Sequence, residues 1–422
     1  MNGLFVLMGL LALSYLGGAL VNRRGGGAIG LPAGIEYVAV GFVLSPSILN
    51  VVERSMLDAF APLVQVALGW LTLIIGLEFG QASGKNIEAK VVLAAVAGAL
   101  LTIALTGGGA FALLSSFPAF FALDGKTSTW LLAAGIGVAT CETTRHAVRW
   151  VMSKYRTDGP VTEMLHGFAA TSDIVPLGAL GLVLAFTDHA PMALGTFTLG
   201  PVERVALTVV IGALLGGIAL VLVGKQVEGH AVWGALFGTA LLGVGTAYRL
   251  GLSHLTVTFV EGLTIAALSS RRTELRKLLA PTERAVMLPT LFLAGTRLDF
   301  HVLGEHRGLV ALLAFVLVAR AIAKLASGSM LSTAAPDIRA AGGLGLGLLS
   351  AGSLSIAFGL TMAMSFPGTL GDTVLIAATL IGVVGEIFAP RALKKLLDRA
   401  GELEQARLSV TTVPPPAVEA KS

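Results

Sequence analysis

Asp173 is the residue of this sequence whose type and position best suit ion chemistry. It lies in the apolar stretch GFAATSDIVPLGAL, beside Ser172. Counted from Pro160, about 13 residues at ~1.5 Å each place it ~20 Å along a helix, near the middle of the ~30 Å hydrocarbon core of a bilayer. Because burial disfavours the charged carboxylate, such an acid holds a proton near neutral pH and can release it when a cation arrives. The alternative is that Asp173 is a permanent salt-bridge partner.

Two further apolar stretches contain polar interruptions that could supply ligands. They are GVATCETTRHAV and GGLGLGLLSAGSLSIAFG (342–359). Unwound backbone offers carbonyl and hydroxyl oxygens, which are hard ligands for Na⁺ or K⁺, and it is tolerated in a membrane only where it lines a cavity. Two broken helices in corresponding positions indicate a site at the midplane. The alternative is that both are ordinary helices packed through glycine. The residues predicted to bind ion or proton are Asp173, Ser172, Thr140, Glu142 and Thr143, with Asp173 and Thr140 as transient metal ligands.

Two basic side chains are candidates for the charge partner of these acids. Arg320 and Lys324 lie one helical turn apart in LVARAIAKLASG. Residues with this spacing share a helix face, so we expect one of them to pair with Asp173 or Glu142 across helices. Lys324 is nearer the expected cytoplasmic end, and the alternative for it is that it extends to the membrane surface.

The other reactive side chains form no recognisable catalytic motif. Glu261 and Glu386 are acids in apolar runs and are candidates for further pairing. His146 and His166 lack metal-site spacing, and Cys141 is the only cysteine. The sequence has no nucleotide-binding P-loop, GxSxG or HExxH motif. It therefore favours neither an enzyme nor a bound cofactor.

The composition indicates that lipid surrounds these residues. The chain has 422 residues, of which 55% are hydrophobic and 13% charged, against roughly 25% charged in soluble proteins. Its 53 glycines suit close helix packing in membranes. The net charge of +4 resides in short loops between apolar runs, so we interpret it as a topology signal and not as a nucleic-acid surface.

Thirteen apolar runs predict an all-α membrane protein with about 13 transmembrane helices. MNGLFVLMGLLALSYLGGALV lacks a basic start and a cleavage site, so it is interpreted as the first helix. Basic residues gather after odd-numbered runs, which predicts an external N-terminus and a cytoplasmic C-terminus in a cell inner (plasma) membrane. The runs cover 3–21, 28–50, 58–79, 89–114, 129–153, 160–187, 202–224, 230–248, 253–270, 284–300, 307–327, 339–364 and 370–391.

A weak internal repeat divides the runs into two halves. LTLIIGLEFG ends the third run and PTLFLAGTRLDF (289–300) the tenth, so that Leu77-Glu78-Phe79 corresponds to Leu298-Asp299-Phe300. The same offset relates Gly41 to Gly262. The two runs point in opposite directions in the predicted topology, which is typical of inverted-repeat transporters. Chance similarity between apolar segments is the alternative.

The predicted domain organisation follows from this repeat. Residues 1–391 form the transmembrane domain, with halves at about 1–187 and 230–391 linked by a helix over 202–224. Residues 392–422 are predicted to be a cytoplasmic basic helix followed by a disordered tail with three consecutive prolines.

Several of these stretches together resemble the monovalent cation/proton antiporter family, the sodium/hydrogen exchanger transmembrane domain. The stretches occur in family order over about 28–390. They are LPAGIEYVAVGFVLSPSIL, LTLIIGLEFG, ATCETT, TSDIVPL, PTLFLAGTRLDF, LVARAIAKLASG and GLGLGLLSAGSLSIAFG.

The resemblance implies a core domain with two crossed broken helices that moves against a dimerisation domain, in a homodimer. It places Asp173 where the family has its ion-binding aspartate and Arg320 where the family has a basic residue. The family usually has Asp, Asn or Gln directly before that aspartate, whereas this chain has Ser172. By resemblance, members with a single acid are electroneutral, which predicts one cation for one proton.

These observations predict a secondary transporter that exchanges Na⁺ or K⁺ for H⁺ by alternating access, with Asp173 binding proton or cation competitively. Two alternatives remain open. The first is a sodium-coupled anion symporter of similar fold, in which the N-termini of the broken helices would hold the anion. The second is a degenerate, non-transporting membrane sensor with a locked pair between Asp173 and Arg320.

Overall fold

The computed structural model describes most of the transmembrane part of the chain. The described residues are 9, 34–79, 81–82, 85–123, 127–187, 193–194, 197–224, 229–334 and 343–403. The helix expected over 3–21 and the tail expected over 408–422 therefore lie outside the described residues, apart from residue 9.

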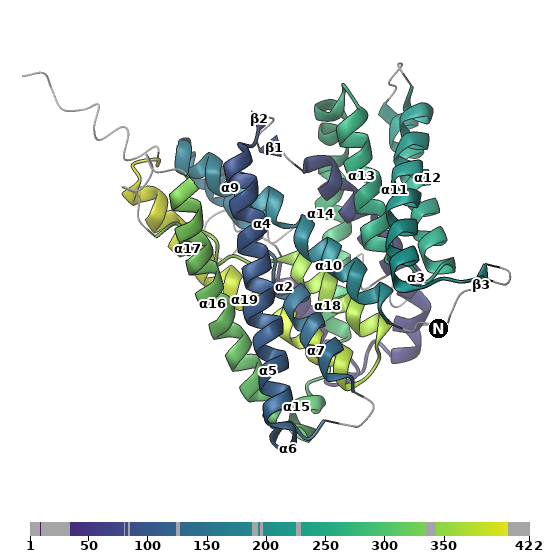
Figure 1. Cartoon of the computed structure of the whole chain (residues 1–422), viewed down its shortest axis with the longest axis vertical. Helices are drawn as coiled ribbons and strands as arrows, with labels where there is room; N and C mark the ends of the chain where they lie inside the picture. The colour runs from purple at the N-terminus through teal and green to yellow at the C-terminus, as the bar shows by residue number, and fades with distance from the viewer. Residues whose placement is uncertain are drawn as a thin grey trace, which may run out of the picture.

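The described chain is almost entirely helical (Figure 1). Its first helices are α2 Glu36–Val43, α3 Arg54–Glu78, α4 Ala89–Ile103, the π-helix η1 Ala104–Gly108, α5 Gly109–Ser116, α6 Pro118–Phe121, α7 Thr129–Ala139, α8 Arg145–Tyr155, α9 Pro160–Ser172 and α10 Ile174–Ala185. The later ones are α11 Pro201–Val223, α12 Gly229–Arg249, α13 His254–Leu268, α14 Arg272–Thr296, α15 His301–Glu305, α16 Gly308–Ala334, α17 Leu344–Gly347, α18 Ser353–Ser365 and α19 Thr369–Arg399.

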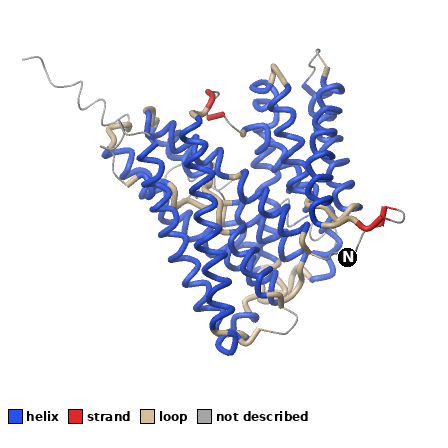
Figure 2. Tube along the Cα trace, viewed as in Figure 1, coloured by secondary structure: helices blue, strands red, loops and turns tan. Residues whose placement is uncertain are grey.

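Two small antiparallel hairpins lie in the connections between helices (Figure 2). The pairs are β1 Gln81–Ala82 with β2 Lys85–Asn86, and β3 Ala193–Leu194 with β4 Phe197–Thr198. Among the described residues, eight helical segments are long and apolar enough to cross a membrane, and α7, α13 and α18 are shorter apolar helices. The prediction of an all-α membrane protein is therefore confirmed.

The helices pack as two groups; α3 and α11–α13 of one group lie to the right in Figure 1, and α4, α5, α9, α16 and α17 of the other lie to the left. We call α2, α3 and α11–α14 the first bundle, because α3 packs on α13 and α14, and α13 packs on α11 and α12. We call α4, α5, α7–α10 and α16–α19 the second bundle, in which α4 packs on α16 and α18 on α19. Contacts of α10 with α11 and α13, and of α14 with α18, join the two bundles.

Glycine permits close backbone approach at two equivalent helix crossings in the first bundle. A Cβ on Gly41 of α2 would overlap the carbonyl oxygen of Phe292 in α14. A Cβ on Gly262 of α13 would likewise overlap the carbonyl oxygen of Leu73 in α3. Gly41 and Gly262 are the two positions that the sequence repeat equates, and small residues at such crossings let membrane helices pack tightly.

Several helix bounds differ from the apolar runs, and three of the differences bear on packing or on the site. α14 begins at Arg272, well before the apolar run at 284, and its polar first turns pack against α3. α19 continues to Arg399 because Leu393, Leu396 and Leu397 form a buried stripe at helical spacing. The run over 160–187 is interrupted at Asp173, between α9 and α10.

Candidate functional site

The first polar interruption is a real break between two helices. α7 ends at Ala139 and α8 begins at Arg145, so residues 140–144 are not helical. The break ends at Thr144, which caps α8: its Oγ1 accepts a hydrogen bond from the backbone N–H of His146 at 3.3 Å. Thr is a favourable N-cap because its hydroxyl satisfies a free first-turn N–H group.

The second interruption is also a break, and the two breaks meet. α17 ends at Gly347 and α18 begins at Ser353. The backbone N–H of Thr144 donates to the carbonyl oxygen of Ser350, and the Ser350 hydroxyl donates to the carbonyl oxygen of Thr144, both at 3.3 Å. The interruptions read from the sequence thus come together deep inside the second bundle.

Glu142 places a carboxylate at the N-terminus of α18. Its Oε2 accepts hydrogen bonds from the backbone N–H groups of Gly352 at 3.1 Å and Ser355 at 2.6 Å. The N-terminal end of a helix carries a partial positive charge and free N–H donors. A buried carboxylate in this position is therefore stabilised by α18, and it has no ion-pair partner in the part of the chain that the structure describes.

Arg320 of α16 bonds to backbone carbonyl groups of both breaks. It donates to the carbonyl oxygens of Thr140 at 2.9 Å and Glu142 at 2.8 Å in the first break. In the second break it donates to those of Leu349 and Ser350, both at 2.9 Å. These groups follow the C-terminal ends of α7 and α17, where a cation complements the helix dipole.

Lys324 is fully buried, and its ammonium group bonds to the first break. Its Nζ donates to the carbonyl oxygen of Cys141 at 2.6 Å and to Oγ1 of Thr143 at 2.7 Å. Neither Lys324 nor Arg320 forms an ion pair with Asp173 or with the Glu142 carboxylate among the described residues. The expected charge partners therefore lie at the site, but they act on the backbone of the breaks.

Asp173 stands between α9 and α10 with its carboxyl group buried. The side chain is 2% exposed, and its Oδ1 accepts no hydrogen bond from the described residues. It lines a pocket together with Glu142, Leu68, Thr72 and Ser353, among others. The cavity volume of about 20 Å³ is enough for one water molecule, and hence for one small ion.

The remaining predicted ligands are buried near the breaks but do not line this pocket. The Ser172 hydroxyl donates to the carbonyl oxygen of Ala169 at 3.3 Å. The Thr140 hydroxyl donates to the carbonyl oxygen of Ile136 at 2.7 Å, and its own carbonyl group accepts from Arg320. Glu142 and Asp173 are thus the two predicted ligands that share one cavity.

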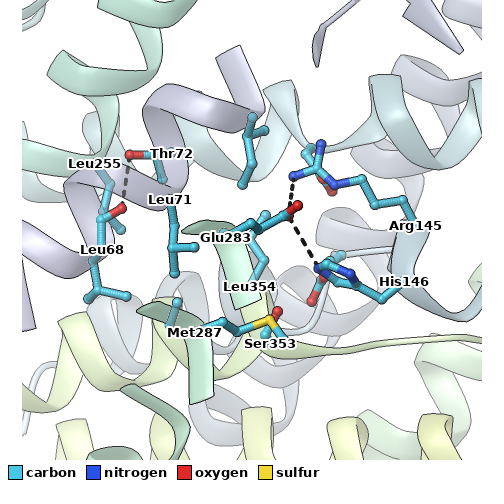
Figure 3. A pocket seen from close by; sticks show the side chains of 14 residues that line it. Leu68, Leu71, Thr72, Arg145, His146, Leu255, Glu283, Met287, Ser353 and Leu354 are labelled. Atoms are coloured by element: carbon cyan, nitrogen blue, oxygen red, sulfur yellow. Dashed lines mark hydrogen bonds and ion pairs between the residues drawn. The ribbon is translucent and has the colours of Figure 1, made fainter. Parts of the chain in front are cut away.

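Three charged or titratable side chains that line the same pocket, those of Arg145, His146 and Glu283, were not predicted as part of the site. Figure 3 shows Glu283 of α14 directed towards Arg145 and His146 of α8, at 3.7 and 3.5 Å. Arg145 also bonds to the buried Glu78 of α3 at 2.5 Å. Because α8 belongs to the second bundle and α3 and α14 to the first, these contacts cross between the bundles.

Glu78 is the centre of the charged cluster that these contacts form. Its carboxylate also accepts hydrogen bonds from Arg149 at 2.7 Å and Arg276 at 2.9 Å. The sequence contained one signal for it, since Arg145 and Arg149 have the i, i+4 spacing of a shared helix face. Glu78, however, closes an apolar run and was interpreted only as part of the repeat.

Comparison with known protein families and structures covers nearly the whole chain. A family described as sodium/hydrogen exchanger, transmembrane, matches residues 11–395. The chain belongs to the sodium/hydrogen exchanger family. The resemblance inferred from the sequence is therefore confirmed, and with it a multi-pass membrane protein of an antiporter family.

Solved structures of a sodium proton antiporter, MjNhaP1 from Methanocaldococcus jannaschii, have a similar fold. One, at pH 8, aligns with a TM-score of 0.65 at 15% identity and covers 94% of this chain and 98% of that one. An electron-microscopy structure of the same antiporter aligns with a TM-score of 0.60 at 14% identity, over 97% of this chain and 99% of that one. No curated protein sequence matches this chain significantly.

Proposed function

We propose that this exchanger-family chain moves a monovalent cation, Na⁺ or K⁺, against H⁺ by alternating access, with Asp173 as the group that binds either ion. The observation that carries the proposal is the state of Asp173. Its carboxyl group is buried, has no ion-pair partner among the described residues, and faces a cavity the size of a single small ion.

Competition at Asp173 follows from its surroundings. An unpaired carboxylate in the membrane interior is costly, so the empty site favours the protonated acid. A cation that enters the cavity supplies the missing positive charge and makes the ionised form favourable. One carboxyl group then carries a proton in one direction and a cation in the other, and never both together.

Two other charges at the breaks are arranged to stay fixed while Asp173 changes partner. Glu142 bonds to the N-terminus of α18, and Arg320 bonds to the carbonyl groups of both breaks. Because backbone groups stabilise these two charges, neither of them requires Asp173 as an ion-pair partner. Asp173 is therefore free to respond to the transported ions.

Alternating access would move the second bundle against the first. The site lies in the second bundle, whereas Leu68 and Thr72 of α3 close the pocket from the first bundle. A displacement between the bundles would therefore exchange the wall of the pocket without dismantling the breaks. The homodimer, the inverted repeat and the orientation of the termini stay predictions from the sequence.

The anion-symporter alternative is disfavoured by the position of Glu142. The N-terminus of a broken helix is where an anionic substrate would bind. In α18 this position is taken by the Glu142 carboxylate, at 2.6 Å from the backbone nitrogen of Ser355. The sensor alternative required Asp173 to be locked to Arg320, and Arg320 bonds to carbonyl groups instead.

Asp173→Asn tests the proposal directly. The amide has nearly the shape of the acid but can neither release a proton nor neutralise a cation. We expect loss of at least about 100-fold in the rate of cation-driven proton movement, measured with a pH-sensitive dye in everted vesicles given Na⁺, K⁺ or Li⁺ pulses. In the wild type, the cation concentration for half-maximal rate should rise about tenfold per unit fall in pH where the proton competes.

The matched control is Asp398→Asn, at an exposed aspartate in the last turn of α19. It should exchange ions at the wild-type rate. Exchange at the normal rate by Asp173→Asn, in protein inserted in normal amount, would show that this carboxyl group is not the ion carrier.

A further inference from the structure

The helix that leads to Asp173 begins without a cap of its own. α9 starts after Gly159, which has no side chain, and its first residue is Pro160, which has no N–H group. The next donors, the backbone N–H groups of Val161 and Thr162, lie in the first turn, where no helical partner exists. By contrast, α8 and α13 are capped by the side chains of Thr144 and Ser253 that precede them.

Glu402, which follows α19, supplies the missing cap from far along the chain. Its carboxylate accepts hydrogen bonds from the backbone N–H groups of Val161 at 2.7 Å and Thr162 at 2.8 Å. It also accepts from the Thr162 hydroxyl at 2.6 Å. The side chain is 4% exposed. A buried carboxylate with three such bonds at a helix N-terminus is strongly stabilised, because the donors and the helix dipole both favour negative charge.

The turn after α19 directs Glu402 towards α9. Gly401 has a φ of 71°, the left-handed conformation that commonly ends a helix. The backbone N–H of Glu402 bonds to the carbonyl oxygen of Leu397 at 3.0 Å, and Leu403 is buried in the same apolar cluster as Leu397. The backbone N–H of Gly401 also bonds to the carbonyl oxygen of Asp398 at 3.0 Å. These two hydrogen bonds are those of a Schellman turn, so the reversal of the chain is well defined.

Gly159 makes the fit specific. A Cβ at this position would overlap the carboxyl carbon of Glu402. Its φ of 163° is extended backbone that any residue can adopt, so the glycine is required by the neighbouring carboxylate and not by the local conformation. The backbone at the start of α9 and the Glu402 side chain that follows α19 are thus sterically complementary.

We propose that Glu402 is a positioning residue for ion exchange, which fixes α9 so that Asp173 at its other end faces the cavity. This inference rests on the proposed function. α9 is 13 residues long and ends at Ser172, directly before Asp173. A helix of this length transmits a displacement of its first turn to its last, since its backbone hydrogen bonds make it nearly rigid. The segment after the last long helix thereby acts on the ion site.

The test compares Glu402→Ala with Glu402→Gln in the full-length protein in proteoliposomes. Glu402→Ala removes the cap, and we expect the half-saturating cation concentration to rise about fivefold, the effect typical of one lost helix cap. The maximal rate should change by less than about twofold, because Asp173 itself is intact. Glu402→Gln keeps one acceptor oxygen and should recover much of the wild-type value.

Gly159→Ala is an independent second variant. Its methyl group displaces the Glu402 carboxylate while leaving the acid in the chain, so it should reproduce the rise seen with Glu402→Ala. The matched control is Asp398→Ala, which removes an exposed carboxylate from the same segment and should leave the half-saturating concentration unchanged.

Amide hydrogen exchange separates this inference from the proposed function, since it needs no transport. Peptides that cover 160–170 should exchange at least about tenfold faster in Glu402→Ala and Gly159→Ala than in the wild type or Asp398→Ala. Faster exchange with no ion movement by the wild type would contradict the proposed function alone. Unchanged exchange, or faster exchange with unchanged half-saturation in an active protein, would overturn the positioning role.

Discussion

At the scale of residues, the buried charges differ in what holds them. Glu142, Arg320 and Lys324 bond to backbone groups at helix ends, and Glu78 bonds to three arginines. Asp173 has neither kind of support, since its Oδ1 is buried without a hydrogen bond from the described residues. A carboxyl group in this state can change its charge at low cost when a mobile ion arrives.

Glu78→Gln should destabilise the protein. The amide would leave Arg145, which is 3% exposed, with its charge poorly compensated, and removing one partner of a buried ion pair typically costs about 3–5 kcal/mol. We expect a clearly lower midpoint of thermal unfolding in detergent.

Glu274→Gln is the matched control for Glu78→Gln, because Glu274 pairs with Arg271 on the surface, where both side chains are well exposed. Surface pairs contribute little to stability, so this variant should unfold at the wild-type temperature. Equal midpoints for the two variants would mean that the cluster around Glu78 contributes no stability.

The sequence could indicate Asp173 and Glu142 because an acidic side chain within a membrane costs free energy and usually has a function. It could not indicate Glu78 or Glu402 as buried groups. Glu78 closes an apolar run and Glu402 lies in the polar segment after the last run. Charged residues in both places usually reach water, and only the folded chain shows that other elements cover these two. Their partners lie 67 or more positions away in the sequence.

At the scale of elements, both breaks were predicted because threonine, serine and glycine interrupt otherwise apolar runs. The interruption at Asp173 was not predicted, since no glycine precedes it and Ile174 continues the apolar pattern. The early start of α14 was missed for the opposite reason. Arg272, Glu274 and Lys277 look like a loop, yet the helix extends through them to pack its polar turns against α3.

Gly262→Ala tests the close crossing of α13 and α3. The new methyl group would overlap the carbonyl oxygen of Leu73, so the two helices must separate and lose packing along their length. We expect less folded protein after extraction and a lower unfolding temperature, because overpacked cores typically lose about 1–3 kcal/mol.

Gly245→Ala is the matched control for Gly262→Ala. Gly245 lies in α12, and a Cβ there would meet nothing within 4 Å. This variant should resemble the wild type in yield and unfolding temperature. If Gly262→Ala behaves in the same way, the crossing tolerates a wider separation than the structure indicates.

At the scale of the whole molecule, two bundles joined by few helix contacts suit a protein that changes its access to the two sides. Exchange of one cation for one proton on one carboxyl group moves no net charge. If one charge did cross, 100 mV would change the driving force by about 2.3 kcal/mol. We therefore predict that a cation jump on proteoliposomes adsorbed to a capacitive electrode gives no transport current, although a pH dye reports exchange.

Ser172→Asp extends the same measurement, because it places a second acid beside Asp173, where the sequence has a hydroxyl. If the single acid sets the stoichiometry, this variant is the one expected to generate current. A potential-sensitive current from the wild-type protein would contradict one-for-one exchange.

The four hydrogen bonds of Arg320 have a mechanical consequence. One guanidinium group from α16 bonds to two non-helical backbone segments that come from opposite halves of the sequence. Neither segment can shift by about an ångström without stretching its hydrogen bonds to Arg320, which also bonds to the other segment. Three separate chain segments are in this way held as one unit, so that Glu142 and Ser353 would keep their relative positions in the pocket wall if the second bundle moved against the first.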